Sequence, residues 1–448
     1  MKATELPRWA DVLLLPLLNV LLALSVAGFV VWAIGQSPFT AVRLLVEGAF
    51  GSPIAWSYTL YYTTNFIFTG LAVAVAFHCG HFNIGAEGQA TLGGLGVGLA
   101  ILATDGWLPG PLLVPLAIAA GMLAGVAWAW VPAWLQAHRG SHIVITTIMF
   151  NFLASTLMVW LLVNVVKAPG TQAVESRGFA PAAALPSVKT MLGALGLEWP
   201  DTPLNLAFVI ALAACAGVWL LLWRTRLGHA IRTVGEAPDA ARYAGIDPKR
   251  TTVVALAISG ALAALVGVNE IAGVHHKLLL DFVAGAGFTG IAVALMGRNH
   301  PLGIVIAALL FGALAQGGSE LVFEMPAFTR DMSGAVQGFV VLFCGALALM
   351  LRPVLVRLWP APARTGHRSD SGGDGAGSSG TGSSSTGSSS GGSSDTGGSG
   401  ASSSHSGSTR GRADDDGRGG DGSPDGGRSA DGDGGGGGGD SGGGGGSD

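Results

Sequence analysis

Ionisable and amide side chains interrupt the apolar stretches of this 448-residue sequence at three places. The seven residues are Asn83, Glu87, Gln89, Asn269, Glu270, Gln316 and Glu320. Polar groups of this kind are costly inside a membrane span, so each is a candidate for a role in function. Gln316 and Glu320 are four residues apart and would share one face of a helix. A line of amides and carboxylates suits hydrogen bonding to the hydroxyls of a sugar or to the edge of a nucleobase.

Each of these groups also has a purely structural interpretation. Glycines close to Glu87 allow close helix packing, and its carboxylate would then bond backbone N–H groups at the start of its own helix. Glu320 and the pair His275–His276 would be hydrated at the outer mouth of a span. Asn151, in the stretch TTIMFNF, is interpreted as a residue that hydrogen-bonds between helices. The sequence alone leaves these alternatives open.

Several kinds of chemistry lack the residues that they require. His275 and His276 have no third converging ligand, so we expect no metal site. Cys79, Cys215 and Cys344 are far apart and lie in or beside apolar runs, which is typical of buried thiols rather than of disulfides. None of the five lysines follows a glycine, and this excludes a G-x-x-x-x-G-K-[ST] phosphate loop. Any ATP that drives this protein must therefore be bound by another chain.

The composition divides the chain into two parts. Residues 371–448 contain 32 glycines, 21 serines, 11 aspartates and four arginines, so this stretch carries a net charge of -7. We expect residues 364–448 to form a disordered Gly/Ser/Asp-rich tail, because such a composition cannot bury a core. The remaining body, residues 1–370, has an apolar content of about 58%, above the globular norm of about 45–50%, and we place the transmembrane domain at residues 1–363 within it. This excludes a soluble enzyme and predicts a transmembrane domain.

The body is predicted to be an all-α polytopic membrane protein, because apolar runs of about 18 residues or more recur along it. We expect about ten spans, at 12–35, 56–77, 84–104, 110–135, 143–166, 204–223, 251–273, 284–297, 302–323 and 332–351. The eighth is short for a bilayer and is interpreted as re-entrant or broken. With the N-terminus inside, 14 of the 20 Lys and Arg residues of the body fall on the cytoplasmic side. Both termini are therefore predicted to be cytoplasmic.

Aromatic residues near the ends of the expected spans are interpreted as anchors at the membrane interface. They are Tyr58, Tyr61, Tyr62, Trp128, Trp130 and Trp134. Stacking of one of them on a nucleobase is the alternative, and the sequence does not choose which residue would do so.

The long inner loop 224–250 contains a short predicted helix. Pro238 suits the first helical position, Asp239 places a carboxylate in the positively polarised first turn, and Gly245 can end the helix in a left-handed conformation. Two turns are too few to be stable alone in water, so this helix is expected to dock. Its small residues would fit a groove on a partner, and packing on its own membrane domain is the alternative.

Four motifs together resemble a known family. They are HFNIGAEGQATLGG at 81–94, SHIVITTIMFNF at 141–152, RTVGEAPDAARYAGI at 232–246 and GFTGIAVALMGRNHPLG at 287–303. In this order, over about residues 10–352, they resemble the permease subunits of bacterial ABC importers for simple sugars, nucleosides and branched-chain amino acids. The motifs NIGAEGQ and VGEAPDAARYAGI look most like the nucleoside-type permeases.

The resemblance implies that the loop 232–246 contacts an ATPase subunit. The residues that would carry this contact are Gly235, Glu236, Pro238, Ala241, Arg242 and Gly245. It also implies a second permease subunit, an external substrate-binding protein and membrane lipid as partners, with no nucleic acid. ATP and Mg²⁺ would belong to the ATPase, and this chain would hold no cofactor and perform no covalent chemistry. We expect it in the bacterial cytoplasmic membrane.

Two functions are compared on this basis. In the first, the chain is the permease subunit of an ATP-driven importer of a nucleoside or simple sugar. In the second, it is an ion-coupled secondary transporter that works alone, with Glu87, Glu270 and Glu320 carrying protons or positioning sodium. The partner-like inner loop favours the first.

Overall fold

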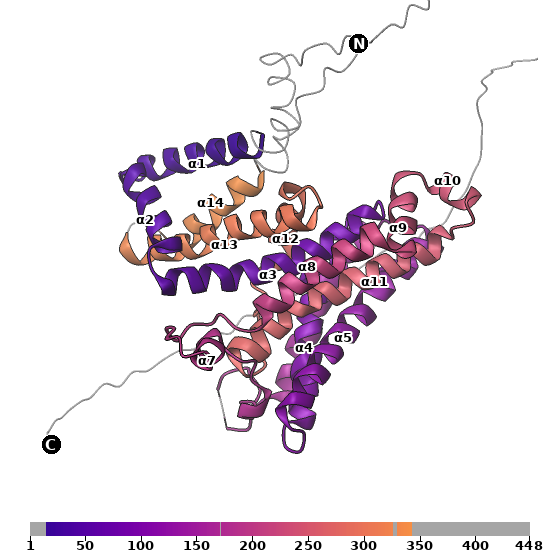
Figure 1. Cartoon of the computed structure of the whole chain (residues 1–448), viewed down its shortest axis with the longest axis horizontal. Helices are drawn as coiled ribbons and strands as arrows, with labels where there is room; N and C mark the ends of the chain where they lie inside the picture. Colours follow the sequence, from indigo (N-terminus) through magenta and orange to yellow (C-terminus); the bar gives the residue numbers. More distant parts are fainter. Residues whose placement is uncertain (1–14, 171, 326–328, 343–448) are drawn as a thin grey trace, which may run out of the picture. The chain divides into compact units, whose positions relative to one another are not determined.

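The computed structural model describes residues 15–170, 172–325 and 329–342 (Figure 1). Throughout these ranges the chain is helical between its loops, with isolated β-bridges in place of strands. Six helices in the described part are long and apolar enough to cross a membrane. These six are Pro53–His78, Gly110–Arg139, Ile143–Val166, Ala207–Arg224, Pro248–His275 and Pro301–Glu324. The expected all-α membrane architecture is therefore confirmed at this level.

The full order of helices follows the apolar pattern of the sequence closely. They are α1 (Leu15–Ala33), α2 (Pro38–Phe50), α3 (Pro53–His78), α4 (Ala86–Thr104), α5 (Gly110–Arg139), α6 (Ile143–Leu161), η2 (Leu162–Val166), η3 (Pro181–Ala183), α7 (Val188–Gly193), α8 (Ala207–Arg224), α9 (Arg226–Glu236), α10 (Pro238–Tyr243), α11 (Pro248–Gly267), η4 (Val268–His275), α12 (Ala286–Met296), α13 (Pro301–Glu324) and α14 (Arg330–Leu342). Four of them, α2, η3, α7 and α9, lie outside every expected span or helix.

Two helices form the centre of the membrane domain. In their most apolar stretches, 78% of α3 and 83% of the span Pro248–His275 is buried, against 28% of α5 and 22% of the span Ile143–Val166. α3 packs on α11, α12 and α13, and α11 also packs on α4 and α5 (Figure 1). The outer helices keep apolar faces that suit lipid or another subunit.

Small residues let α4 pack closely into this centre. A side chain at Gly93 would overlap Ala264 of α11, and one at Gly94 would overlap the ring of Phe282. Membrane helices use such positions because backbones can then approach each other, and dispersion contacts rather than water drive the packing. The glycine-rich motif around 85–98 therefore has a packing role along its whole length.

The eighth expected span is broken. α12 covers 11 residues, and the preceding segment 276–285 consists of bends and turns instead of helix. His276, Asp281 and Ala284 in this segment have positive φ angles of 51°, 57° and 48°. The expectation of a re-entrant or broken element at 284–297 is confirmed in its short helix.

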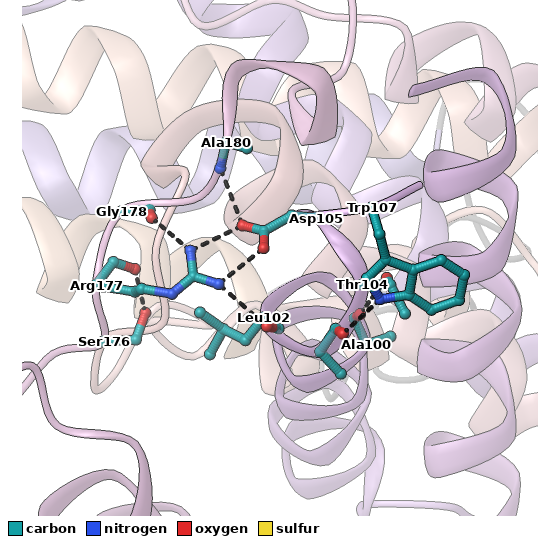
Figure 2. A network of polar contacts seen from close by, with 10 residues as sticks. Ala100, Leu102, Thr104, Asp105, Trp107, Ser176, Arg177, Gly178 and Ala180 are labelled. Atoms are coloured by element: carbon teal, nitrogen blue, oxygen red, sulfur yellow. Dashed lines mark hydrogen bonds and ion pairs between the residues drawn. The ribbon is translucent and has the colours of Figure 1, made fainter. Parts of the chain in front are cut away.

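A network of ionic and polar contacts holds the loop after η2 against the end of α4 (Figure 2). The guanidinium of Arg177 donates to both carboxylate oxygens of Asp105, at 2.7 and 2.8 Å, and to the carbonyl of Leu102 at 3.0 Å. The backbone N–H of Ala180 donates to the same carboxylate at 3.1 Å. Arg177 holds the pKa of the Asp105 carboxyl below its ordinary value, mainly through these side-chain hydrogen bonds.

The remaining expectations about the ends of the chain lie outside the described residues. These include the tail 364–448, Cys344 and the part of the last expected span beyond residue 342. The boundary at 363–364 and the cytoplasmic position of both termini stay predictions.

Candidate functional site: an inner docking helix and buried polar clusters

The short helix α10 has the predicted bounds and ends. It runs from Pro238 to Tyr243, with the proline in its first turn, and Gly245 after it has a φ of 78°. The positive φ favours glycine, since a side chain would clash with the backbone there. Asp239 lies in the first turn and pairs with Arg242 at 3.3 Å. Local sequence chemistry was thus sufficient to define this helix.

Five of the six residues of α10 are exposed, and only Ala241 is buried. Tyr243 is 95% exposed and Ala241 is 0% exposed. The side chain of Ala241 therefore packs inside the chain, and contact with a partner falls to its exposed neighbours. Glu236, Pro238 and Arg242 are among these exposed residues.

α9 connects α10 to the membrane helices and is held at both ends. A side chain at Gly228 would overlap the backbone of Leu221 and Leu222 at the end of α8. At the other end, a side chain at Gly235 would overlap the carbonyl of His78 and approach the backbone nitrogen of Gly80 to 2.8 Å. Because both neighbours are backbone, α9 cannot move closer to the ends of α3 and α8 without displacing them. In Figure 1, α9 and α10 lie together at the end of α8 and α11.

A carboxylate cluster joins α3 to the π-helical segment η4. Glu270 is 2% exposed and accepts hydrogen bonds from Tyr61 at 2.6 and 2.7 Å and from the amide of Asn65 at 2.5 Å. Its second oxygen lies 3.3 Å from the Nε2 of His275. Single-turn π-helices are frequent at functional sites, and here the π-turns place Glu270 toward α3. Tyr61 was expected to anchor the chain at the membrane interface, and its hydroxyl instead serves this cluster.

Asn269 extends the same cluster to α8. Its amide donates to Asn65 at 2.9 Å, and its oxygen accepts from Asn205 at 2.9 Å. Asn205 also caps the start of α8 by accepting from the N–H of Ala207 at 2.8 Å. Asn65 therefore hydrogen-bonds to both of the adjacent pathway candidates, Asn269 and Glu270.

Asn83 and Gln89 form a separate buried cluster near the start of α4. The amide of Asn83 donates to Gln89 at 3.1 Å and to Ser259 at 2.9 Å, and Ser259 donates to the carbonyl of Ala72 at 2.6 Å. Both residues are almost completely buried, at 0% and 2% exposure. Their hydrogen bonds are satisfied within the chain, so this cluster positions α3, α4 and α11 relative to one another.

Glu87 binds the start of a broken span. Its two oxygens accept from the backbone N–H groups of Gly285 and Gly287, at 2.9 and 2.8 Å. A carboxylate at this position neutralises the positive end of α12 and satisfies N–H groups that have no partner within the helix. The structural interpretation of Glu87 had the right type of partner, but the helix concerned is α12 and not its own.

The last two pathway candidates lie apart from these clusters. Gln316 and Glu320 are half-buried on α13, and Glu320 packs against Gly48 of α2. Neither hydrogen-bonds to another candidate within the described ranges. Asn151 has the expected interhelical role, because it accepts from the N–H of Gly88 and donates to the carbonyl of Ile84, both at 2.9 Å.

Comparison with known proteins adds the family to this geometry. Residues 55–345 match the model of the family described as branched-chain amino acid transport system / permease component. The chain belongs to this permease family. The match covers α3 to α14, and so includes every cluster described above.

Three relatives have names that specify a solute. The glucose ABC transporter permease of Haloferax volcanii is 34% identical over 332 residues, which are 73% of this chain and 86% of that protein. The guanosine ABC transporter permease of Bacillus subtilis is 33% identical, over 70% of this chain and 87% of its own. The nucleoside ABC transporter permease of Lactococcus lactis is 32% identical, over 73% and 90%.

Membership of the family makes the chain a multi-pass membrane permease subunit. An exposed helix such as α10 is compatible with such a subunit, since a permease component works with other chains of its transport system. An ion-coupled transporter that works alone requires no exposed helix of this kind. The family thus favours the ATP-driven alternative over the secondary transporter.

Sequence reasoning missed Tyr61, Asn65 and Asn205 as members of the buried clusters. Each lies in or beside an apolar run, and Asn65 carried the same signal as Asn269, namely an amide inside a span. Tyr61 and Glu270 are 209 residues apart in sequence, and no local pattern pairs residues at that separation.

Proposed function

We propose that this chain is the transmembrane permease subunit of an ATP-binding-cassette importer, and that it moves a nucleoside or a simple sugar across the cytoplasmic membrane. The observation that carries the proposal is the exposed α10, held by α9 on the ends of α3 and α8. The names of the relatives support the solute class, because they include glucose, guanosine and nucleosides. ATP and Mg²⁺ are bound by a partner ATPase.

The partners follow from the arrangement of the chain. A cytoplasmic ATPase binds the exposed face of α10, with Glu236, Pro238 and Arg242 among the contacts and Gly235 and Gly245 shaping the segment. A second permease subunit covers part of the exposed apolar faces of the outer helices, and lipid covers the rest. A substrate-binding protein delivers the solute at the opposite side, where the loop 168–205 lies. This assignment places both termini in the cytoplasm, with about ten spans.

Motion of the ATPase reaches the membrane domain through backbone contacts. A push on α10 is passed by α9 to residues 78–80 at one end of α3. Further along α3, Tyr61 and Asn65 hold Glu270 of η4. A shift of α3 therefore changes the cluster that ties it to η4 and, through Asn269, to α8. Switching between outward-open and inward-open states requires an element such as α3, which contacts the docking segment at one end and the membrane core further along.

Co-purification tests the docking helix directly. We expect Tyr243→Ala to lower recovery of the ATPase subunit with this chain, because the ring is 95% exposed on the docking face. Trp107→Ala is the matched control, since this aromatic residue is 72% exposed but lies after α4, away from α9 and α10. Undiminished recovery with Tyr243→Ala and with Glu236→Lys in the same chain would refute docking through this segment.

Activity of the assembled importer tests the function itself. In proteoliposomes that contain the permease, its ATPase and its binding protein, we expect ATP-dependent uptake of radiolabelled guanosine or glucose. Uptake by this chain alone, driven by a proton or sodium gradient, would contradict the proposal and favour a secondary transporter.

A further inference from the structure

The irregular segment 276–285 lies inside the membrane domain. Its contacts with α4 indicate how deep in the membrane it lies. The ring of Phe282 lies against Gly94 of α4, and Gly94 in turn lies against Gly267. Gly93 and Val97 of α4 contact Gly121 of α5. Gly121 is about 16 Å from one end of α5 and about 27 Å from the other, at a rise of about 1.5 Å per residue. Phe282 therefore lies well inside the hydrocarbon core, which is about 30 Å thick.

Asp281, the neighbour of Phe282, is exposed at this depth. Its φ of 57° is a left-handed backbone conformation, which aspartate tolerates better than most residues. No hydrogen bond or ion pair holds its carboxylate within the part of the chain that the structure describes. An exposed carboxylate at mid-membrane depth is too costly to face lipid, so it must face water or another polar partner.

A small cavity lies beside this carboxylate. It has a volume of about 160 Å³, and its polar lining consists of Glu87 and Thr91 of α4, Ser155 of α6 and Asp281. The rest of the lining is apolar, and no basic residue is among the described residues around it. At about 30 Å³ for each liquid water, the space holds about five waters. That is enough for one sugar ring and too little for a complete drug-sized ligand, whose pockets measure about 300–1,000 Å³.

The four polar groups have different amounts of hydrogen-bonding capacity left. Glu87 is occupied by the N–H groups of Gly285 and Gly287. The hydroxyl of Thr91 donates to the carbonyl of Glu87 at 2.9 Å, which leaves its oxygen lone pairs to accept. The carboxylate of Asp281 has both oxygens available as acceptors. The cavity thus offers acceptors to a ligand that brings O–H donors.

We propose that this cavity is a recognition subsite on the transport pathway, in which Asp281 accepts hydrogen bonds from two adjacent hydroxyls of a neutral sugar or ribonucleoside. A carboxylate with two oxygens matches a vicinal diol, Thr91 can accept from a third hydroxyl, and Ser155 can accept from it or donate to it. An amino acid fits less well, because its ammonium could pair with Asp281 but its own carboxylate would then lie in an acidic cavity with no basic residue to pair with. The assignment rests on the proposed function and narrows its solute class to diol-containing molecules.

The test uses the complete importer in proteoliposomes, with radiolabelled guanosine and glucose as probes and with 2′,3′-dideoxyguanosine and 2,3-dideoxyglucose as their diol-free analogues. For the solute that the unmodified importer takes up, we expect Asp281→Asn to raise KM about ten- to hundredfold, as loss of a charge-assisted hydrogen bond predicts. Uptake of the diol-free analogue is expected to change less than threefold. The ratio between the two probes, and not total uptake, is the readout.

Two further variants separate recognition from assembly. Ser155→Ala removes one hydroxyl of the cavity and is expected to raise KM less than Asp281→Asn does. Glu324→Gln is the matched control, because it removes an exposed carboxylate at the end of α13 that is not among the residues lining the cavity.

The outcomes distinguish this subsite from the proposed function. An unmodified importer that takes up neither probe with ATP counts against the proposed function. An active importer in which Asp281→Asn leaves the probe ratio unchanged refutes the subsite alone. Loss of permease pairing in Asp281→Asn, measured by the mass of the purified complex, would assign Asp281 to a subunit contact and overturn the proposal.

Discussion

The contact between Gly235 and the end of α3 allows a sharp test of how motion enters the membrane domain. In Gly235→Ala the new methyl group would overlap the carbonyl of His78 and lie 2.8 Å from the nitrogen of Gly80 and 3.0 Å from the carbonyl carbon of Cys79. All three neighbours are backbone, so no side-chain rotation relieves the overlap. Since carbon contacts are optimal at about 3.5–4.0 Å, α9 must move away from α3 by about 0.5 Å or more.

The size of the effect follows from that displacement. Overpacking of this kind typically costs about 1–3 kcal/mol. If about 1.4 kcal/mol of this is lost from the coupling between α10 and α3, the amount of solute moved per ATP falls about tenfold. ATP hydrolysis itself should continue, because the variant leaves the exposed face of α10 unchanged.

The assay measures uptake and ATP hydrolysis in the same proteoliposomes and reports their ratio. Gly217→Ala on α8 is the matched control, because a side chain there meets nothing within 4 Å. Alanine in a helix is about 1 kcal/mol more favourable than glycine, so this control should keep or raise the melting temperature. A normal uptake-to-ATP ratio in Gly235→Ala, or an equal loss in Gly217→Ala, would refute transmission through the α9–α3 contact.

Three further predictions concern the buried cluster, the loop after η2 and the junction between α3 and α4. Tyr61→Phe deprives Glu270 of a donor and should destabilise the chain by about 1–3 kcal/mol; an unchanged melting temperature in detergent would contradict the role of this hydroxyl. Because the pKa of Asp105 is lowered by Arg177, the contact stabilises the protein above the ordinary pKa of about 4, and this stabilisation is lost as the pH falls through the lowered value. Asp105→Asn should therefore cleave faster in limited proteolysis at pH 7, with a smaller difference from the unmodified protein at pH 3, and equal rates at pH 7 would count against it. Burial lowers the pKa of His81, so the stability of the protein should decline as the pH falls below about 6.5. In His81→Gln the melting temperature should therefore depend less on pH between 7.5 and 5.5, and an unchanged dependence would contradict this.

Elements with local determinants were predictable from the sequence. The bounds of α10 follow from Pro238 and Gly245, each of which acts within its own turn. The long spans follow from hydropathy, because a bilayer requires about 20 apolar residues in one helix. The break before α12 was visible as a span that was too short.

Partners that lie far apart in sequence were not predictable. Glu87 was expected to bind N–H groups at a helix start, which is correct chemistry, but the helix it binds begins almost 200 residues later. α9 escaped detection because its docking depends on Gly228 and Gly235 meeting the backbone of other helices, and a glycine carries no hydropathy signal. α2 is too short and too polar to be recognised as a span.

The contacts of α3 with α9 at one end and with η4 further along give a physical reason for a buried carboxylate at position 270. An apolar contact between α3 and η4 would hold equally well over small sliding motions, because dispersion attraction has no direction. Hydrogen bonds of 2.5–2.7 Å from Tyr61 and Asn65 to Glu270 weaken steeply when their geometry changes. A shift of α3 driven from Gly80 must therefore either carry η4 with it or break the cluster. In either case, a small movement of α10 leads to a displacement of η4 or to loss of the Glu270 hydrogen bonds. Both changes occur next to the segment 276–285, which contains Asp281.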